Sequence, residues 1–427
     1  MAGESAPGEL TADVVGIGFG PANMALAIAL EERAGTGAVR ARFFEKQREF
    51  GWHRGMLIDG ATMQVPFLKD LSTPRDPTSR FGFLSYLHAK NRMMDFLNRK
   101  SFYPLRTEFH DYLAWAAEQL ADRVAYGSEV IALRPVKDER GVTRSVDLVV
   151  RCQGMLSTVR TRTVVLASGL EPVLPDGVMA TDRVWHSADL LYQTEKIATG
   201  EPRTFVVVGA GQSAAETVGF LHERFPHAEV HAVFARYGFS VADDSSFANQ
   251  IFDPVARDEY FGAPEQVKEM LSGYHANTNY SVVDDDLIRD LYDRVYREGL
   301  SGTRRLHLHK VSRVREQTAG PDDVRVDIEF LPTGDRTAVQ ADAVIYATGY
   351  RPGDPLTLLG DLGGACLRDE RGRLRVGRDY RIQTTDDVEA AIFLQGSTEH
   401  SHGISSSLLS NTAVRAGEIA EALEACL

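Results

Sequence analysis

Two segments of the chain repeat one pattern, in which a short β-branched run turns on glycines and passes into a helix-forming stretch. The first is Asp13-Val-Val-Gly-Ile-Gly-Phe-Gly, followed by an alanine-rich segment from Ala22. The second is Thr204-Phe-Val-Val-Val-Gly-Ala-Gly, followed by a stretch from Gln212 to about Glu223. Each pattern predicts a strand, a tight turn and a helix, which open a βαβ unit that places a pyrophosphate at a helix N-terminus. The chain is therefore predicted to be an α/β protein with two Rossmann-like dinucleotide-binding domains.

The residues of the two turns have distinct physical roles. In the first turn, Gly16 permits the sharp bend and Gly18 lets the backbone approach a pyrophosphate, while the third fingerprint position is Pro21. The fingerprint of the second turn is complete, with Gly209, Gly211 and Ala214.

The end of the second strand in each unit indicates which dinucleotide the unit prefers. The strand predicted from Val39 to Phe44 ends at Glu45, and an acid there accepts ribose hydroxyls, as in an FAD-type unit. The strand predicted from Glu229 to Phe234 is followed by Arg236 and has no acid at its tip. An acid would repel a 2′-phosphate, whereas Arg236 can pair with one. The second unit is therefore predicted to prefer NADPH over NADH.

Composition excludes several classes of protein. The 427 residues are 43% hydrophobic, enough for two or three packed domains. The net charge of -13 argues against nucleic acids and acidic membrane surfaces as partners. Glycines and Pro21 interrupt the apolar stretch from Val14 to Leu30, so we expect no transmembrane helix. Met1 to Asp13 lack the features of a signal peptide, and three distant cysteines fit a reducing compartment, so a cytoplasmic location is expected.

Flavoproteins that hold two dinucleotides are best known for dithiol reduction and for oxygenation. Dithiol reduction needs a redox-active cysteine pair, which this sequence lacks. Oxygenation and NADPH oxidase activity remain. His400 and His402 alternate as metal ligands do, but no third ligand follows at a recognisable spacing, so no metal site is expected. The run Asp284 to Asp286 is interpreted as a solvated helix start.

Further motifs resemble one family. The chain is similar to the microbial N-hydroxylating flavin monooxygenases, most closely the L-ornithine N5-monooxygenases, whose sister group hydroxylates L-lysine. Besides the two turns, the resemblance rests on Gly51 to His53, Met63 to Leu71, Asp243 to Asp253, Asn277 to Ser281, Ala347 to Tyr350 and His402 to Asn411. The Leu-Lys-Asp-Leu and Asn-Gln-Ile-Phe segments within it have no generic dinucleotide role.

The resemblance implies how the chain is divided and which residues bind. It implies an FAD-binding domain of residues 1–200 and 346–427, an NADPH-binding domain of residues 201–249 and 280–345, and a small, mostly helical substrate-binding insertion of residues 250–279. FAD would contact Gly16, Gly18, Pro21, Glu45, Trp52, His53, Gln64, Val130, Ser407, Leu408 and Leu409. NADPH would contact Gly209, Gly211, Gln212, Ser213, Ala214, Arg236, Asn279, Tyr280 and Ser281.

The implied substrate site consists of Lys69, Asn249, Phe252, Asn279 and Ser410. A buried amino-acid zwitterion needs a cation for its carboxylate and oxygen acceptors for its ammonium. Lys69 would supply the cation, and Asn249 with a backbone carbonyl near Asn279 would supply acceptors. No side chain needs to act as a nucleophile, and Gln64, Asn279 and Ser281 would position the reactants.

The expected activity is N-hydroxylation of L-ornithine to N5-hydroxy-L-ornithine with NADPH and O2, through a C4a-hydroperoxyflavin, for siderophore or related peptide biosynthesis. A homo-oligomer is expected. Two alternatives stay open. The nearer is an N-hydroxylase of L-lysine or of a diamine such as putrescine, which has no carboxylate for Lys69. The other is an NADPH oxidase or a redox-sensing flavoprotein that releases peroxide.

Overall fold

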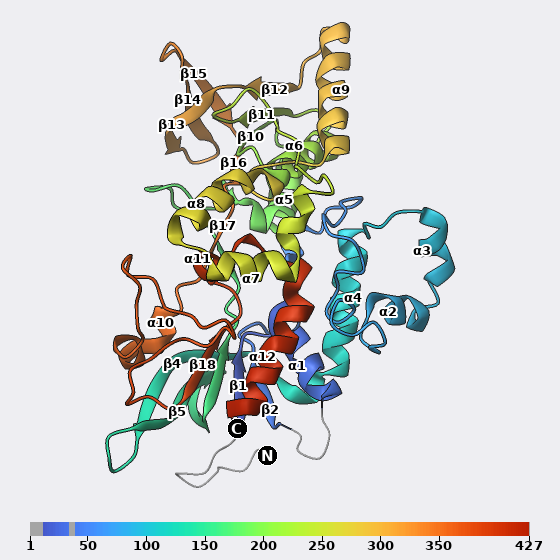
Figure 1. The fold of residues 1–427 in the computed structure, drawn as a ribbon. Helices are drawn as coiled ribbons and strands as arrows, with labels where there is room; N and C mark the ends of the chain where they lie inside the picture. Colours follow the sequence, from blue (N-terminus) through green and yellow to red (C-terminus); the bar gives the residue numbers. More distant parts are fainter. Residues whose placement is uncertain (1–11, 34–38, 427) are drawn as a thin grey trace.

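Two five-stranded parallel sheets form the framework of the protein (Figure 1). The computed structural model describes residues 12–33 and 39–426. Almost all of the N-terminal segment that we expect not to be a signal peptide lies outside these residues. Within them, none of the helices combines the length and the apolar character needed to cross a bilayer.

The first sheet has the order β18-β7-β1-β2-β3. Its strands are β1 (Val14–Ile17), β2 (Ala41–Phe44), β3 (Val124–Ala125), β7 (Thr163–Leu166) and β18 (Ala391–Leu394). Strands β1, β7 and β18 are buried at every position, as expected for a parallel sheet covered on both faces. Helix α1 (Pro21–Glu32) follows β1 and packs against the C-terminal helix α12 (Thr412–Cys426). The predicted strand–turn–helix thus forms.

The second sheet has the order β12-β11-β10-β16-β9. Its strands are β9 (Val184–His186), β10 (Thr204–Val208), β11 (Glu229–Val233), β12 (Leu306–His309) and β16 (Ala343–Tyr346). Helix α6 (Gln212–Arg224) follows β10, and α9 (Asp285–Ser301) packs on α6. The sequence-based boundary at residue 201 leaves out β9, which belongs to this sheet because it pairs with β16.

Three smaller antiparallel sheets complete the β structure. They consist of β4 (Ser128–Lys137), β5 (Thr143–Cys152) and β6 (Met155–Thr161); β13 (Ser312–Ala319), β14 (Val324–Phe330) and β15 (Arg336–Ala341); and the pair β8 (Leu170–Pro172) and β17 (Tyr350–Pro352). Strand β8 follows β7 and strand β17 follows β16. The two segments that connect the large sheets therefore lie side by side and pair with each other.

Helices α2 (Phe83–Ala89), α3 (Met93–Arg99) and α4 (Arg106–Gln119) form a projecting layer beside the first sheet (Figure 1). The helical spacing of apolar residues in the sequence predicts two amphipathic helices between Phe81 and Val124. Asn91 divides the first of them, because its backbone adopts the left-handed conformation with φ 56°. The remaining short helices are α5 (Leu190–Ile197), α10 (Leu356–Leu359) and α11 (Glu399–His402).

The segment between β11 and α9 is largely helical, as predicted. It contains α7 (Pro254–Gly262) and α8 (Glu265–Tyr274), which lie in front of the two sheets, at the level between them, in Figure 1. Arg257 of α7 is only 2% exposed and forms a two-point ion pair with Glu418 of α12. The insertion is therefore anchored to the C-terminal helix of the first half.

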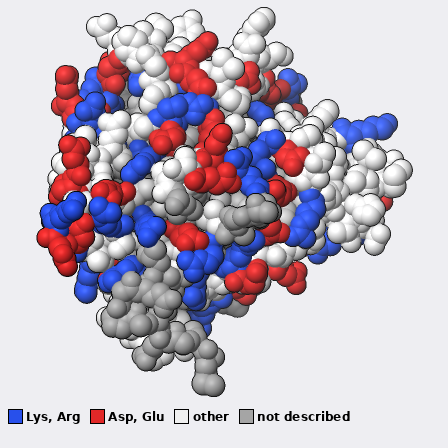
Figure 2. Space-filling model, turned by 60° about the horizontal axis from the view of Figure 1, so that its bottom comes forward, with Lys and Arg blue, Asp and Glu red and all other residues white. Residues whose placement is uncertain are grey.

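Lysines and arginines alternate with aspartates and glutamates on the face shown in Figure 2. The two signs are thus interspersed over this face.

His402 gives the fold a defined acid sensitivity. Its fully buried ring stacks on Tyr380 with centroids 4.1 Å apart, and its Nδ1 lies 2.8 Å from the hydroxyl oxygen of Ser401. Burial lowers its pKa from the ordinary 6.5 to about 3. The folded state therefore holds His402 neutral, and the associated stability is present above about pH 6.5 and lost as the pH falls toward 3.

We expect wild-type protein to lose about 2 kcal/mol of unfolding free energy through His402 between roughly pH 6.5 and 5. Urea unfolding at the two pH values measures this loss. His402→Gln should show a shallower pH dependence, because the amide retains polar contacts but does not titrate. Equal slopes for the two proteins would remove His402 as a source of the acid sensitivity.

Candidate active site

A cavity of about 2400 Å³ lies between the two halves of the chain, and both glycine turns contribute to its wall. It exceeds the roughly 300–1,000 Å³ of a typical small-molecule pocket and has room for more than one extended ligand. Most of the predicted binding residues line it: Gly18, Pro21, Glu45, Trp52, His53, Gln64, Lys69, Val130, Gly209, Gly211, Gln212, Ser213, Asn249, Phe252, Asn279, Tyr280, Ser281, Ser407, Leu408, Leu409 and Ser410.

Three predicted residues lie outside this wall. Gly16 supports the first turn from within the sheet, where an added Cβ would lie 2.2 Å from the ring of Phe43. Ala214 is fully buried beneath the second turn. Arg236 is exposed and lines a separate, smaller pocket with Arg313 and Arg315.

The two glycine turns share the same geometric constraint. Gly18 has φ +83°, and a Cβ there would lie 2.4 Å from the carbonyl oxygen of Ala167. Gly209 has φ +145°, and a Cβ there would lie 2.4 Å from the carbonyl oxygen of Ala347. Only glycine combines this conformation with so close a backbone approach. Pro21 departs from the fingerprint without disturbing the fold, because it occupies the first turn of α1. A backbone N–H has no partner within the helix at this position, so the N–H that proline lacks is not missed.

Glu45 stands at the end of β2 and faces the first turn. One carboxylate oxygen accepts the N–H of Phe19 at 2.8 Å, and the other accepts the N–H of Gln47 at 2.8 Å. Each oxygen retains a further lone pair, and Glu45 lines the cavity. The carboxylate therefore both holds the turn and remains able to accept ribose hydroxyls, as an FAD-type unit requires.

His53 and Trp52 form an aromatic section of the wall. Their rings are perpendicular with centroids 4.7 Å apart, and the His53 ring also meets Tyr350 edge-on at 5.7 Å. Burial in the wall, and then the charge of Arg106, lower the pKa of His53 to about 4. His53 is therefore a neutral imidazole at physiological pH and presents a flat, uncharged surface suited to a planar ring system.

Lys69 is a partly buried cation in the cavity wall. Its ammonium lies 5.5 Å from the centroid of the Phe252 ring, which brings together two residues predicted for the substrate. It has no ion-pair or hydrogen-bond partner for its ammonium among the described residues. Burial lowers the pKa of Lys69, and Asp253 opposes this shift. A cation in this environment favours an anionic ligand.

Asp70, which the motif analysis did not single out, holds the Lys69 loop in place. Its buried carboxylate accepts hydrogen bonds from the backbone N–H groups of Ser72, Thr73 and Phe83, at 2.9, 2.6 and 2.6 Å. The loop is thereby tied to the start of α2. The backbone that carries Lys69 is therefore anchored next to α2.

Two further predicted substrate residues face the same cavity. The hydroxyl of Ser410 is buried and has no hydrogen-bond partner among the described residues. The amide of Asn249 donates to the carbonyl of Asp244 at 2.6 Å, which leaves the oxygen of that amide as an acceptor. Ser410 and Asn249 thus supply polar groups suited to the ammonium end of an amino acid.

The predicted NADPH residues of the second half converge on one loop. The backbone of Ser281 passes over the second turn, because a Cβ on Gly211 would lie 3.4 Å from the Ser281 Cα. Arg236 donates a hydrogen bond to the Ser281 carbonyl at 2.9 Å. The hydroxyl of Tyr280 donates to Glu399 of α11 at 2.7 Å and so ties this loop to the first half.

Asp284 corrects one interpretation from the sequence. Asp285 and Asp286 are exposed in the first turn of α9, as interpreted, whereas Asp284 is only partly exposed and its carboxylate accepts hydrogen bonds from Gln212 at 2.9 Å and from Gln64 at 3.3 Å. Burial raises its pKa. Nearby, Arg106 of α4 forms a buried two-point ion pair with Glu216 of α6 at 2.6 and 2.8 Å. Together these contacts join residues predicted for FAD to residues predicted for NADPH.

His400 and His402 do not converge on a common point. His400 contacts the carbonyl of Leu374 at 2.8 Å, whereas His402 has separate partners in the core. Their alternation reflects the short helix α11 and its packing.

The fold and the cavity define a protein that holds two dinucleotides against each other, with room for a small amino acid. A family model described as L-lysine 6-monooxygenase/L-ornithine 5-monooxygenase matches residues 10–352. The chain belongs to this family, which confirms the resemblance seen in the motifs.

Solved and characterised relatives cover nearly the full length. The structure of an ornithine N-hydroxylase from Kutzneria sp. 744, which holds reduced FAD, NADP+ and L-ornithine, is 47% identical, covers 97% of this chain and 99% of its own, and has a TM-score of 0.94. An ornithine hydroxylase from Pseudomonas aeruginosa is 36% identical, with coverages of 97% and 99% and a TM-score of 0.92. The L-ornithine N(5)-monooxygenase of Burkholderia cepacia is 38% identical over 403 residues, which are 92% of this chain and 90% of that protein.

Proposed function

We propose that the chain is an FAD- and NADPH-dependent monooxygenase that hydroxylates the side-chain amine of L-ornithine. The observation that carries this proposal is Lys69, a partly buried cation that has no ion-pair partner among the described residues and lies in the wall of a cavity that both glycine turns share. Such a cation favours an anionic group such as a carboxylate, which an amino acid has and a diamine lacks.

The residues of this chain bind, orient and exclude water. Lys69 holds the α-carboxylate, while the Asn249 oxygen and the Ser410 hydroxyl accept from the α-ammonium. The side-chain amine then points toward the wall formed by Trp52 and His53. FAD, when bound along this wall, supplies the activation of O2 after reduction by NADPH. Because His53 is neutral, it places no positive charge beside the amine, which must be uncharged to react.

The second half orients the nicotinamide coenzyme in this proposal. Gly209 and Gly211 cradle its pyrophosphate, and the Asn279–Ser281 loop lies over it. The hydrogen bonds from Gln64 and Gln212 to Asp284 hold the two halves in one relative position, so that both coenzymes face one cavity. A role in siderophore or related peptide biosynthesis, a cytoplasmic location and a homo-oligomeric state remain predictions.

One assay tests the proposal. NADPH consumption and hydroxylamine formation are measured together with L-ornithine, L-lysine and putrescine in turn. We expect ornithine to give the highest ratio of hydroxylated product to NADPH consumed. Lysine, longer by one methylene, should bind yet place its amine poorly. Faster hydroxylation of putrescine would make the amino-acid assignment wrong, and peroxide without product from all three would favour the oxidase.

Arg236 is proposed to select NADPH. Replacing it with alanine should raise the KM for NADPH by tenfold or more, because a charge-assisted contact to the 2′-phosphate is lost. The KM for NADH should change little, since NADH carries no such phosphate. Steady-state kinetics with both coenzymes checks this. An equal rise for both would mean that Arg236 acts only through its bond to the Ser281 carbonyl.

A further inference from the structure

A cluster of polar side chains lies on the second sheet, away from the cavity. His231 of β11 and His307 of β12 are register partners on neighbouring parallel strands, so their side chains share one face. Glu229 lies two residues before His231 on that face, and His309 lies two residues after His307. Strands β11 and β12 are labelled near the top of Figure 1.

Glu229, the carboxylate of the cluster, is at the opposite end of the sheet from the coenzyme residues. Glu229 begins β11, whereas Arg236 follows its carboxyl end. At about 3.3 Å per residue, the strand separates the two ends by roughly 13 Å. A ligand at the cluster would not compete with a dinucleotide at the second glycine turn.

The ligand atoms have the spacing of a metal site. The Nε2 atoms of His231 and His307 lie 3.4 and 3.5 Å from one carboxylate oxygen of Glu229. One ligand atom from each of the three residues lies within 4.8 Å of the others. Ligands at the zinc–nitrogen distance of about 2.0–2.1 Å in a tetrahedron are spaced by about 3.4 Å. Two of the three distances between ligand atoms, from Glu229 to His231 and from Glu229 to His307, therefore already match this spacing.

Apart from their approach to Glu229, the same nitrogens have no hydrogen bond among the described residues. His231 is 9% exposed, and neither its Nε2 nor that of His307 has a hydrogen-bond partner among the described residues. The Nδ1 of His231 lies 3.0 Å from the Nε2 of His309. If Nδ1 donates this bond, the lone pair of His231 is on Nε2 and faces Glu229. Metal-binding histidines are commonly held in this way by a partner on the other nitrogen.

We propose that Glu229, His231 and His307 bind one divalent transition-metal ion of the zinc class, with water as the fourth ligand and His309 as the supporting partner of His231. Imidazole and carboxylate together suit Zn²⁺. The His231 and His307 rings are stacked at 4.5 Å with an angle of 12°, so binding requires one ring to rotate about its Cβ–Cγ bond. The ion would cross-link the edge strand β12 to β11.

The sequence did not reveal this site, because its ligands are separated by 76 residues between His231 and His307 and meet only through strand register. The expectation of no metal rested on the spacing of His400 and His402. The new site shares no residue with that pair.

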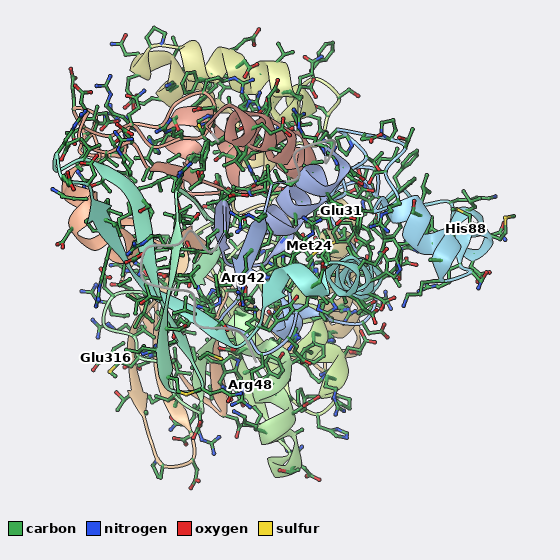
Figure 3. The ribbon with its side chains drawn as sticks, turned by 90° about the horizontal axis from the view of Figure 1, so that it is seen from below. Met24, Glu31, Arg42, Arg48, His88 and Glu316 are labelled. Atoms are coloured by element: carbon green, nitrogen blue, oxygen red, sulfur yellow. The ribbon has the colours of Figure 1, made fainter. Side chains whose placement is uncertain are left out.

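Zinc titration of tag-free, FAD-loaded protein against a chromophoric chelator tests the proposal. We expect one Zn²⁺ per chain, with binding weakened tenfold or more in Glu229→Gln and in His307→Gln. Both variants leave the buried His231 in place, and FAD content and the NADPH-dependent reduction of FAD verify that they fold. His88→Gln is the matched control, since His88 is exposed on the projecting helix α2 (Figure 3).

A second readout reports ligand geometry. Co²⁺ added in place of Zn²⁺ should give the visible absorption bands of a four-coordinate site in wild type and in His88→Gln, and these bands should be absent from Glu229→Gln and His307→Gln. Failure to take up Zn²⁺, or uptake of equal affinity in wild type and both ligand variants, would overturn the proposal. Hydroxylation of ornithine is measured separately, so its failure leaves the metal result unaffected.

Discussion

Lys69→Ala should lower the kcat/KM for L-ornithine by about 30-fold to several hundred-fold, which corresponds to a lost charge-assisted contact of about 2–4 kcal/mol. The contact would be strong because the ammonium is partly buried, next to Phe252, and has no competing ion pair among the described residues. FAD content and the rate of FAD reduction by NADPH should remain close to wild type. Stopped-flow reduction and product assays measure these quantities separately.

The matched control is Lys137→Ala, which removes an exposed lysine on β4 and should leave turnover unchanged. Putrescine provides an internal control, because a substrate without a carboxylate should lose little when Lys69 is removed. Normal hydroxylation of ornithine by Lys69→Ala would contradict the carboxylate assignment. A parallel loss of FAD would instead assign Lys69 a structural role in the loop that Asp70 holds.

Local sequence predicted the elements that local physics determines. The two glycine turns and the helices after them follow from β-branched runs, from glycines and from helix propensity within about twenty residues. The two covering helices predicted between Phe81 and Val124 became three, because the left-handed backbone of Asn91 is not evident in the hydrophobic period. The place of β9, which precedes the predicted boundary at residue 201, was not evident because it joins the second sheet through β16, which lies far along the chain.

The interpretation of Asp284 failed for a related reason. An acidic run before a helix usually faces water, and nothing near it in the sequence indicates otherwise. Its partners Gln212 and Gln64 are 72 and 220 residues away, so its environment depends on how the two halves meet. The ion pair between Arg106 and Glu216 spans 110 residues in the same way. Contacts between domains are thus the part of the site that required the structure.

The substrate residues were found from the sequence only through motif resemblance. Composition alone makes Lys69 an ordinary surface lysine. The structure supports its selection because the Lys69 loop and the segment of Phe252 meet, although they are separated by 183 residues. No periodic pattern in the sequence predicts the contact between these two segments.

Gly18→Ala and Gly209→Ala should each weaken the binding of a different coenzyme. Each adds a Cβ 2.4 Å from a backbone carbonyl oxygen at a positive φ, so the turn must shift. We expect Gly18→Ala to be purified with at least tenfold weaker FAD binding. Gly209→Ala should retain FAD, while its reduction by NADPH at low concentration should slow by tenfold or more. Flavin absorbance and stopped-flow reduction measure the two effects.

Two glycines provide matched controls, since a Cβ at Gly200 or Gly364 meets no heavy atom within 4 Å. Alanine at either position should leave both coenzymes unaffected. Weak FAD binding in Gly209→Ala with normal FAD in Gly18→Ala would reverse the assignment of the two units. Because the two turns have the same constraint but lie on different sheets, a difference between the variants reports which coenzyme each sheet holds and not the general cost of straining a glycine turn.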